Sequence, residues 1–309
     1  MRHLISLKEQ TREDILNLLD LAICLKSRGI SMMGGPLHGR TLIMLFQKSS
    51  TRTRLSFESA MTELDGHAIF LDARTTQLGL SDFNDEIQAI MRFGDVLMFR
   101  ALAASDVEKA ASYNRIPVID ACSEKYHPCQ ALADLLTMYE KADNLMNIKK
   151  VAWLGIENNV SNTLMLLCTK LGISFSIAAP EIDPASRDFE LAEMANATGL
   201  VTRVETAAEA VMDADFVHTD TWMNMEFFEN GHVKPNFESE FKRRLDIFSS
   251  FQLNAQLINT YAPQAKIMHC MPCHVGYEIT RDAIDHPNSV IFDQAENRKH
   301  MQKAVLLWL

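Results

Sequence analysis

The sequence predicts an α/β protein with two doubly wound, parallel-sheet domains. A chain of 309 residues is long for a single hydrophobic core. Short apolar runs alternate with segments of helical periodicity along most of its length, which is the rhythm of a parallel sheet with covering helices. The polar stretch 142–149 interrupts this rhythm. We therefore expect one domain over 1–142, a second over 143–290, and an amphipathic C-terminal helix in 291–309.

The composition narrows the class of protein. Apolar residues make up 47% of the chain and charged residues 23%, which is ordinary for a globular enzyme. A net charge of −10 argues against nucleic acid and anionic membrane as partners. No apolar run has the length of a membrane span, and the N-terminus lacks a signal-peptide core. We expect a cytoplasmic protein whose six cysteines are thiols.

The first domain is expected to begin with an amphipathic helix over 11–26, capped by Thr11. The continuous apolar run Thr41–Phe46 is typical of a strand that is buried on both faces. The segment 74–84 is polar and rich in turn residues, so we expect a mobile loop there. Further strands are expected at 67–71, 96–99 and 116–119, and helices at 52–65, from about 85, and at 105–113.

The second domain repeats the pattern. Strands are expected at 151–154, 174–179, 200–204, 216–218 and 266–268, and helices at 160–171, 184–197 and 206–213. Ligands of open parallel sheets gather where the strands end. Polar residues directly after these strands are therefore the candidates for a site. The segment 225–241 is polar, aromatic and turn-rich, which indicates either a lid or a surface insertion without a function.

The most informative segment is 46–58, FQKSSTRTRLSFE. It joins a buried strand to a helix, and its serines and threonines are good helix N-caps. Free backbone N–H groups and the positive end of the helix dipole favour an anion at such a turn. Lys48, Arg52 and Arg54 add three cations. The alternative is a capped helix with solvated arginines. The segment has no glycine, so it is neither a Walker loop nor a dinucleotide fingerprint.

The order S-T-R-T-R-x-S-F-E after a buried strand resembles the carbamoyl phosphate loop of the aspartate and ornithine carbamoyltransferases. Further segments resemble the same family in the same order along nearly the whole chain. They are Arg100 after a strand, H-P-C-Q at 127–130, Asn159, D-T-W-M-N-M at 220–225, H-C-M-P at 269–272 and A-E-N-R at 295–298.

The resemblance implies a reaction in which a neutral amine attacks the carbonyl carbon of carbamoyl phosphate and phosphate leaves, without a metal or cofactor. It implies that the helix over 291–309 packs back on the first, carbamoyl phosphate domain. It also implies L-ornithine as the amine, and a homotrimer or a multiple of it with shared active sites. Gln77 would reach the site of a neighbouring subunit.

The site residues that this resemblance implies fall into three groups. The carbamoyl phosphate ligands would be Ser50, Thr51, Arg52, Thr53, Gln77, Arg100, His127, Gln130, Cys270, Met271 and Arg298. The ornithine ligands would be Asn159, Asp220, Asn224 and Met225. The catalytic residues would be Arg100, His127, Gln130, Asp220 and Cys270, with Asp220 and Cys270 orienting the amine and helping to remove its proton.

Some features depart from the family pattern and leave alternatives open. Ile156 and Glu157 replace the usual glycine- and aspartate-bearing turn, and Asn224 and Glu226 replace a serine and a glycine. A catalytically silent paralogue and an enzyme for another amine such as putrescine are therefore the alternatives. The segment HCMPCH at 269–274 also allows a redox or metal protein, although haem attachment would need export and zinc a second ligand pair.

Overall fold

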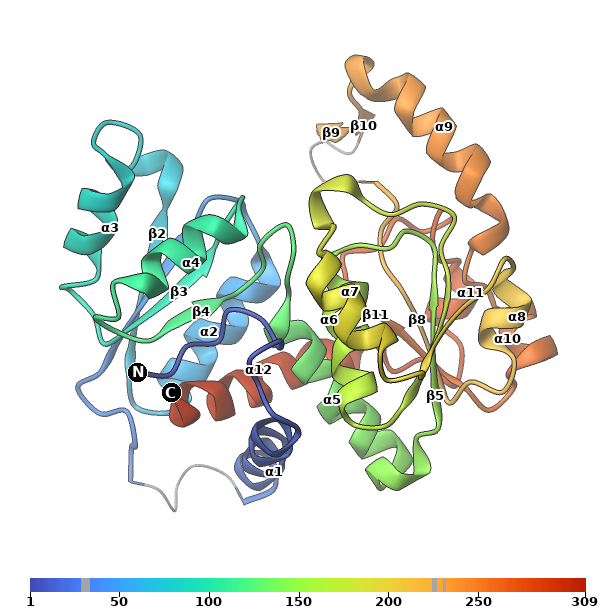
Figure 1. The fold of residues 1–309 in the computed structure, drawn as a ribbon, viewed down its shortest axis with the longest axis horizontal. Helices are drawn as coiled ribbons and strands as arrows, with labels where there is room; N and C mark the ends of the chain where they lie inside the picture. The colour runs from blue at the N-terminus through green and yellow to red at the C-terminus, as the bar shows by residue number, and fades with distance from the viewer. Residues whose placement is uncertain (29–33, 224–226, 230–231) are drawn as a thin grey trace. The chain divides into compact units, whose positions relative to one another are not determined.

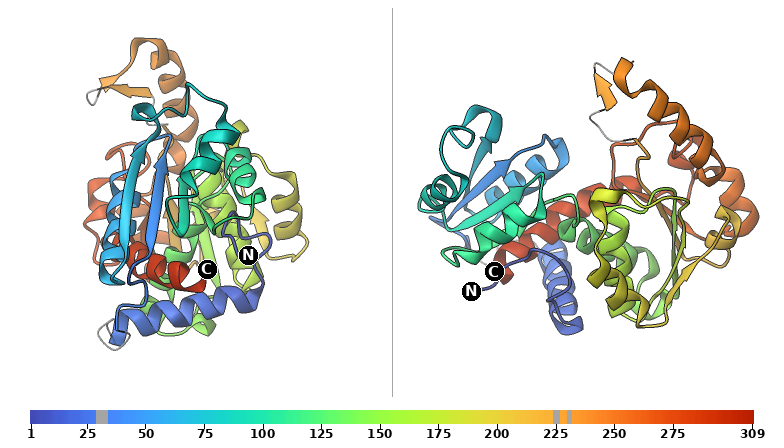
Figure 2. Two further views of the ribbon diagram at one scale, coloured as in Figure 1. Left: turned by 90° about the vertical axis from the view of Figure 1, so that its left-hand side faces the viewer. Right: turned by 45° about the horizontal axis from the view of Figure 1, so that its top comes forward.

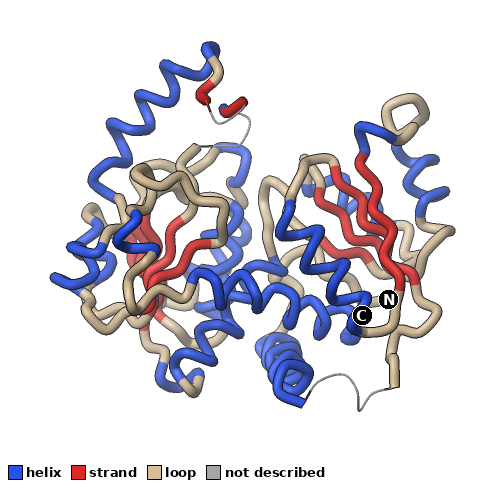
Figure 3. Tube along the Cα trace, turned by 180° about the vertical axis from the view of Figure 1, so that it is seen from behind, coloured by secondary structure: helices blue, strands red, loops and turns tan. Residues whose placement is uncertain are grey.

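The structure, a computed structural model, describes residues 1–28, 34–223, 227–229 and 232–309. The chain forms two compact units. Unit 1 comprises Met1–Leu136, Asn162–Leu167 and Ala295–Leu309, and unit 2 comprises Thr137–Ser161 and Cys168–Gln294 (Figure 1). Each unit has its own parallel sheet with helices around it, which confirms the predicted fold class (Figure 3).

Unit 1 is built on a four-stranded sheet in the order β2-β1-β3-β4. All of its strand pairs are parallel. The central strand β1 has five buried residues in a row, as its apolar run predicts. The strands are β1 (Thr41–Phe46), β2 (His67–Asp72), β3 (Val96–Arg100) and β4 (Val118–Asp120).

Alternate residues of β1 and β3 pack against helices α3 and α4 on one face of this sheet. Ile43, Leu45, Leu97 and Phe99 share a buried cluster with residues of those two helices. The helices that belong wholly or partly to unit 1 are α1 (Arg12–Arg28), α2 (Thr51–Glu63), α3 (Phe83–Ile90), α4 (Ala104–Ser112), α5 (Pro128–Ala142), α6 (Asn159–Lys170) and α12 (Ile291–Trp308).

The C-terminal part of α12 belongs to unit 1, and the two ends of the chain lie side by side there (Figures 1 and 2). Arg2 donates a hydrogen bond to the carbonyl of Trp308 at 3.0 Å. Lys299 and Lys303 each form a 2.7 Å ion pair with Glu63 of α2. These contacts attach the last helix to the first domain, as the family resemblance implies.

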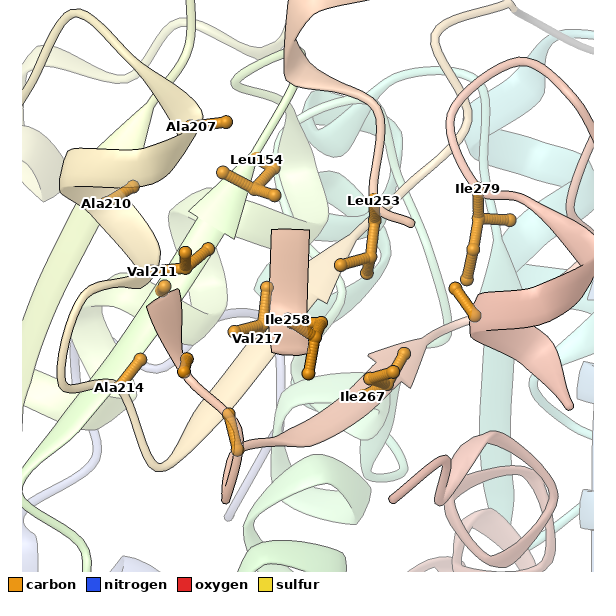
Figure 4. Packing of buried hydrophobic residues seen from close by; sticks show 14 of the residues in the cluster. Leu154, Ala207, Ala210, Val211, Ala214, Val217, Leu253, Ile258, Ile267 and Ile279 are labelled. Atoms are coloured by element: carbon orange, nitrogen blue, oxygen red, sulfur yellow. The ribbon is translucent and has the colours of Figure 1, made fainter. Parts of the chain in front are cut away.

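Unit 2 is built on a five-stranded parallel sheet in the order β11-β8-β5-β6-β7. A buried cluster on one face contains Leu154, Val217 and Ile267 from three neighbouring strands, together with residues of α8, α10 and α11 (Figure 4). The strands are β5 (Lys150–Leu154), β6 (Ser174–Ala178), β7 (Val201–Arg203), β8 (Phe216–Thr219) and β11 (Lys266–His269).

The remaining helices of unit 2 are α7 (Phe189–Asn196), α8 (Ala207–Val211), α9 (Glu238–Phe248), α10 (Ala255–Tyr261) and α11 (Arg281–Ile284). The predicted helix over 184–197 is wrong in its first part. Asp183 caps a short 3-10 turn over Pro184–Ser186, and Asp188 caps α7 by accepting from the N–H of Leu191. Two successive N-caps therefore divide the segment.

The segment expected to be a lid is described only in part. Residues 224–226 and 230–231 lie outside the described residues, while β9 (Phe228–Glu229) and β10 (His232–Val233) pair antiparallel and lead into α9. Arg244 of α9 donates to the carbonyl of Trp222, and its guanidinium lies 5.0 Å from the centre of the Phe227 ring. Within the described chain, no helix is both long enough and apolar enough to span a membrane.

Candidate active site

The turn after β1 is the helix N-terminus that the sequence predicts. Ser50 is the N-cap of α2, with extended backbone angles, and its hydroxyl accepts from the N–H of Thr53 at 3.3 Å. Thr51 is the first residue of the helix and is exposed, whereas Thr53 is fully buried. The turn therefore presents backbone N–H groups and hydroxyls at the positive end of a helix dipole.

Two arginines from distant parts of the chain meet at this turn. The hydroxyl oxygen of Thr53 accepts from Nη2 of Arg298 at 2.9 Å and from Nη1 of Arg100 at 3.4 Å. Arg100 ends β3, and Arg298 lies on α12 with only 2% of its surface exposed. The predicted residues Thr53, Arg100 and Arg298 therefore form one cluster in unit 1.

Burial and the repulsion between cations disfavour the positive charge of this cluster. Burial, followed by the repulsion of Arg100, lowers the pKa of Arg298 to about 10. Burial raises the pKa of the nearby Asp120 well above its ordinary value and so opposes its ionisation. The cluster therefore carries positive charge that an anionic ligand would stabilise.

His127 precedes α5 and faces the same cations. It is 5% exposed, and its backbone N–H donates to the hydroxyl of Thr163 at 3.0 Å. Burial, and then the charges of Arg298, Arg100, Lys48 and Arg52, hold its pKa well below the ordinary 6.5. Its imidazole is therefore neutral at pH 7, and within the described chain its buried Nδ1 has no hydrogen-bond partner.

Gln130 lies on the first turn of α5 and is 1% exposed. Its amide nitrogen donates to Asp134 at 2.8 Å. Its amide oxygen is buried, and no hydrogen-bond partner for it occurs among the residues that the structure describes. The predicted residues His127 and Gln130 thus each bring an unsatisfied buried polar atom to unit 1.

A second set of predicted residues meets in unit 2, at the carboxyl ends of β5, β8 and β11. The thiol of Cys270 donates to Oδ1 of Asp220 at 3.0 Å. The side-chain amide of Asn158 donates to Oδ2 of the same carboxylate at 2.8 Å. Asp220 is 8% exposed. This is a buried carboxylate held by neighbouring groups, suited to bind and orient an ammonium or amine.

Asn158 is a residue that the sequence analysis missed. Its Oδ1 accepts from the N–H groups of Val160 and Ser161, so it caps α6, while its amide nitrogen faces Asp220. The predicted Asn159 is the next residue, the first of α6, and is partly exposed. The sequence did contain a signal for Asn158, because an asparagine before an apolar helical pattern is a typical N-cap.

The replaced turn at Ile156 and Glu157 is firmly anchored. The Glu157 carboxylate is buried and pairs with the guanidinium of Arg203 on β7 through two bonds of 2.5 and 2.9 Å. Gly155, with φ +100°, lets Trp222 approach closely, because a Cβ there would lie 2.5 Å from the indole nitrogen. Glu157, which departs from the family pattern, is therefore paired with a specific residue, Arg203.

The segment 269–274 was open to a metal or redox interpretation. Asp220, His269 and Cys270 each place one potential ligand atom within 4.8 Å of the others. His269, however, accepts from the N–H of Met271 at Nδ1, and its Nε2 lies 3.2 Å from Glu278. Both imidazole nitrogens thus orient the turn in which Met271 has a φ of 58°. Neither Cys270 nor Cys273 is part of a disulfide.

Gln77, Asn224 and Met225 are the predicted residues that remain. Gln77 is exposed in a bend, and its carbonyl accepts from the N–H of Leu80, which is 86% exposed. Asn224 and Met225 lie outside the described residues.

The chain is similar to known proteins over its whole length. Residues 2–140 match the family described as aspartate/ornithine carbamoyltransferase, carbamoyl-P binding domain, and residues 147–309 match its Asp/Orn binding domain. Ornithine carbamoyltransferase of Pyrococcus abyssi is 41% identical, over 100% of this chain and 95% of the relative. The ornithine carbamoyltransferase of Bacillus subtilis is 40% identical, over 99% of this chain and 92% of the relative.

Solved structures give the same result. The ornithine carbamoyltransferase from Pyrococcus furiosus has a TM-score of 0.87 at 40% identity, covering 100% of this chain and 96% of that one. The enzyme from Thermus thermophilus has a TM-score of 0.84 at 34% identity, covering 99% and 97%.

The lowered pKa of His127 predicts a specific dependence of stability on pH. In the unfolded chain His127 regains its ordinary pKa of 6.5. Below pH 6.5 the unfolded state therefore binds more protons, and stability falls as the pH decreases towards the folded-state pKa. The free energy of unfolding, measured with urea between pH 6.5 and 5, should fall with decreasing pH more steeply in the wild type than in His127→Gln. The difference between the two slopes should reach up to about 1.4 kcal/mol per pH unit. Equal slopes would contradict a buried, neutral His127.

Proposed function

The chain belongs to the aspartate/ornithine carbamoyltransferase family, and from this premise we propose that it is an ornithine carbamoyltransferase. It would convert carbamoyl phosphate and L-ornithine to L-citrulline and phosphate, in the cytoplasm. The observation that carries the proposal is that Arg100 and the buried Arg298 both donate to the buried hydroxyl of Thr53, beside the neutral His127. The names of the relatives support ornithine as the amine.

In this proposal the phosphate of carbamoyl phosphate lies at the N-terminus of α2. Ser50, Thr51, Arg52 and Thr53 bind its oxygens through N–H groups, hydroxyls and the guanidinium. The leaving phosphate gains negative charge as its bond to the carbonyl carbon breaks. Cations that are already held in place stabilise that charge without having to reorganise.

The carbonyl end of the same substrate is assigned to Arg100, His127, Gln130 and Arg298. The carbonyl oxygen becomes negative as the amine attacks, and it needs donors. The low pKa of His127 makes it a neutral donor, provided that one of its nitrogens carries the proton towards the oxygen. The arginines supply the charge.

The amine is assigned to the second set of residues. Asp220, held by Cys270 and Asn158, orients the δ-amine of ornithine and helps to remove its proton, so that the neutral amine can form the new C–N bond. Asn159, Asn224 and Met225 would bind the α-amine and α-carboxylate, and Cys270 and Met271 would also contact carbamoyl phosphate. The reaction proposed here transfers a group without a change of oxidation state.

The first test is the change Arg52→Ala. It removes a cation from the N-terminus of α2, and we expect kcat/KM for carbamoyl phosphate to fall by roughly 10²-fold or more. Arg54→Ala is the matched control, because Arg54 pairs with Glu58 and lies over the Phe70 ring. The control should retain activity within several-fold. Equal losses in both variants, or near-normal turnover of Arg52→Ala, would refute the phosphate assignment.

The second test concerns the amine. A site that pairs an α-carboxylate and an α-amine should reject the diamine putrescine, because its own polar groups would be left without partners. We expect kcat/KM for ornithine to exceed that for putrescine by at least about 10²-fold. A ratio below one would identify a putrescine enzyme. Citrulline formation would also exclude a catalytically silent paralogue.

The third test concerns assembly. We propose a homotrimer, or a multiple of it, in which Gln77 of one subunit completes the site of the next. The exposure of Gln77 and Leu80 on one loop supports this arrangement. Mixing subunits that carry Gln77→Ala with subunits that carry Arg52→Ala should restore activity, since some sites would then contain neither change. A fully active monomer in sedimentation, or no recovery on mixing, would contradict the proposal.

A further inference from the structure

Gln130 and Asp134 form a buried pair on α5. They are one helical turn apart and are 1% and 0% exposed. The amide nitrogen of Gln130 donates to Oδ1 of Asp134 at 2.8 Å. A carboxylate accepts hydrogen bonds and does not donate them, so the contact fixes which end of the Gln130 amide faces Asp134.

The other end of the amide is fixed by the same contact. The oxygen of Gln130 lies across the amide carbon from the nitrogen, and therefore faces away from Asp134. It is buried, and within the described residues it has no hydrogen-bond partner. A buried acceptor that cannot turn and has no partner is suited to a ligand that offers a donor.

We propose that Asp134 is a positioning residue that makes Gln130 a fixed hydrogen-bond acceptor and thereby selects a ligand bearing an NH₂ group over one bearing oxygen at the same place. The inference rests on the proposed function, in which Gln130 contacts the carbamoyl group. A carbamoyl group and a carboxyl group have nearly the same shape. They differ in that an NH₂ donates where a carboxylate oxygen only accepts.

The fixed amide therefore distinguishes a ligand with an NH₂ group from one with an oxygen at the same place. An oxygen in place of the NH₂ group would face the Gln130 oxygen, so two acceptors would meet in a buried place without a proton between them. If the amide could turn, its own NH₂ would face the ligand oxygen and the mismatch would disappear. Asp134 prevents that turn, because its carboxylate would then face the amide oxygen.

The experiment uses two stable probes, phosphonoacetamide and phosphonoacetate, which differ in having NH₂ or oxygen at this place. Their dissociation constants are measured by calorimetry on the full-length protein. The test variant is Asp134→Asn, whose side chain keeps the volume and can partner either orientation of Gln130. We expect it to shift the ratio of the two constants by about tenfold or more in favour of phosphonoacetate.

Asp134→Asn also removes a negative charge, which by itself favours a more anionic ligand. The same change is therefore made in a Gln130→Leu background, where the charge effect remains but no amide is left to turn. There the shift should stay below about threefold. Leu132→Val changes a buried residue on the same helix and is the control for a loosened helix. It should leave the ratio unchanged.

A shift of equal size in both backgrounds, or no shift in either, overturns the role of Asp134 and leaves the proposed function intact. Wild-type protein that binds neither phosphonoacetamide nor inorganic phosphate overturns the proposed function and this inference with it. Asp134→Ser, whose hydroxyl also partners either orientation, is expected to give the same shift. It replaces Asp134→Asn if that variant does not fold.

Discussion

The contact of two arginines with one threonine hydroxyl is the interaction on which the rest of unit 1 depends. Thr53 is buried at the start of α2, Arg100 ends β3, and Arg298 comes from α12 at the far end of the chain. Guanidinium groups repel one another, and burial has already lowered the pKa of Arg298 to about 10. Folding must therefore hold them together at a cost, which the binding of an anion, as proposed, would offset.

The surrounding structure holds these arginines in place and responds to their charge. α12 is held on α2 by the pairs of Lys299 and Lys303 with Glu63, which keeps Arg298 in place. The same positive field, together with burial, keeps His127 neutral. One cluster of cations thus gives both the site proposed for a phosphate and an imidazole that can donate a hydrogen bond without carrying charge.

In unit 2, the turn that departs from the family pattern brings a buried charge together with its own partner. Glu157 stands where the family has a different turn, yet its carboxylate is paired with Arg203, and the next residue, Asn158, faces Asp220. The charge introduced by Glu157 is compensated on β7, so the turn can still position a polar side chain beside the carboxylate.

The sequence by itself determined the two parallel-sheet units, the strand at 41–46 and the helix cap at Ser50, because apolar periodicity and capping are local properties. It also placed Arg100, His127, Asp220, Cys270 and Arg298 at strand ends or in family motifs. It could not decide that the amide of Asn158 donates to Asp220, or that the amide of Gln130 donates to Asp134. Only the tertiary structure decided these points, because the direction of a side chain depends on partners distant in sequence or on burial that no short pattern records.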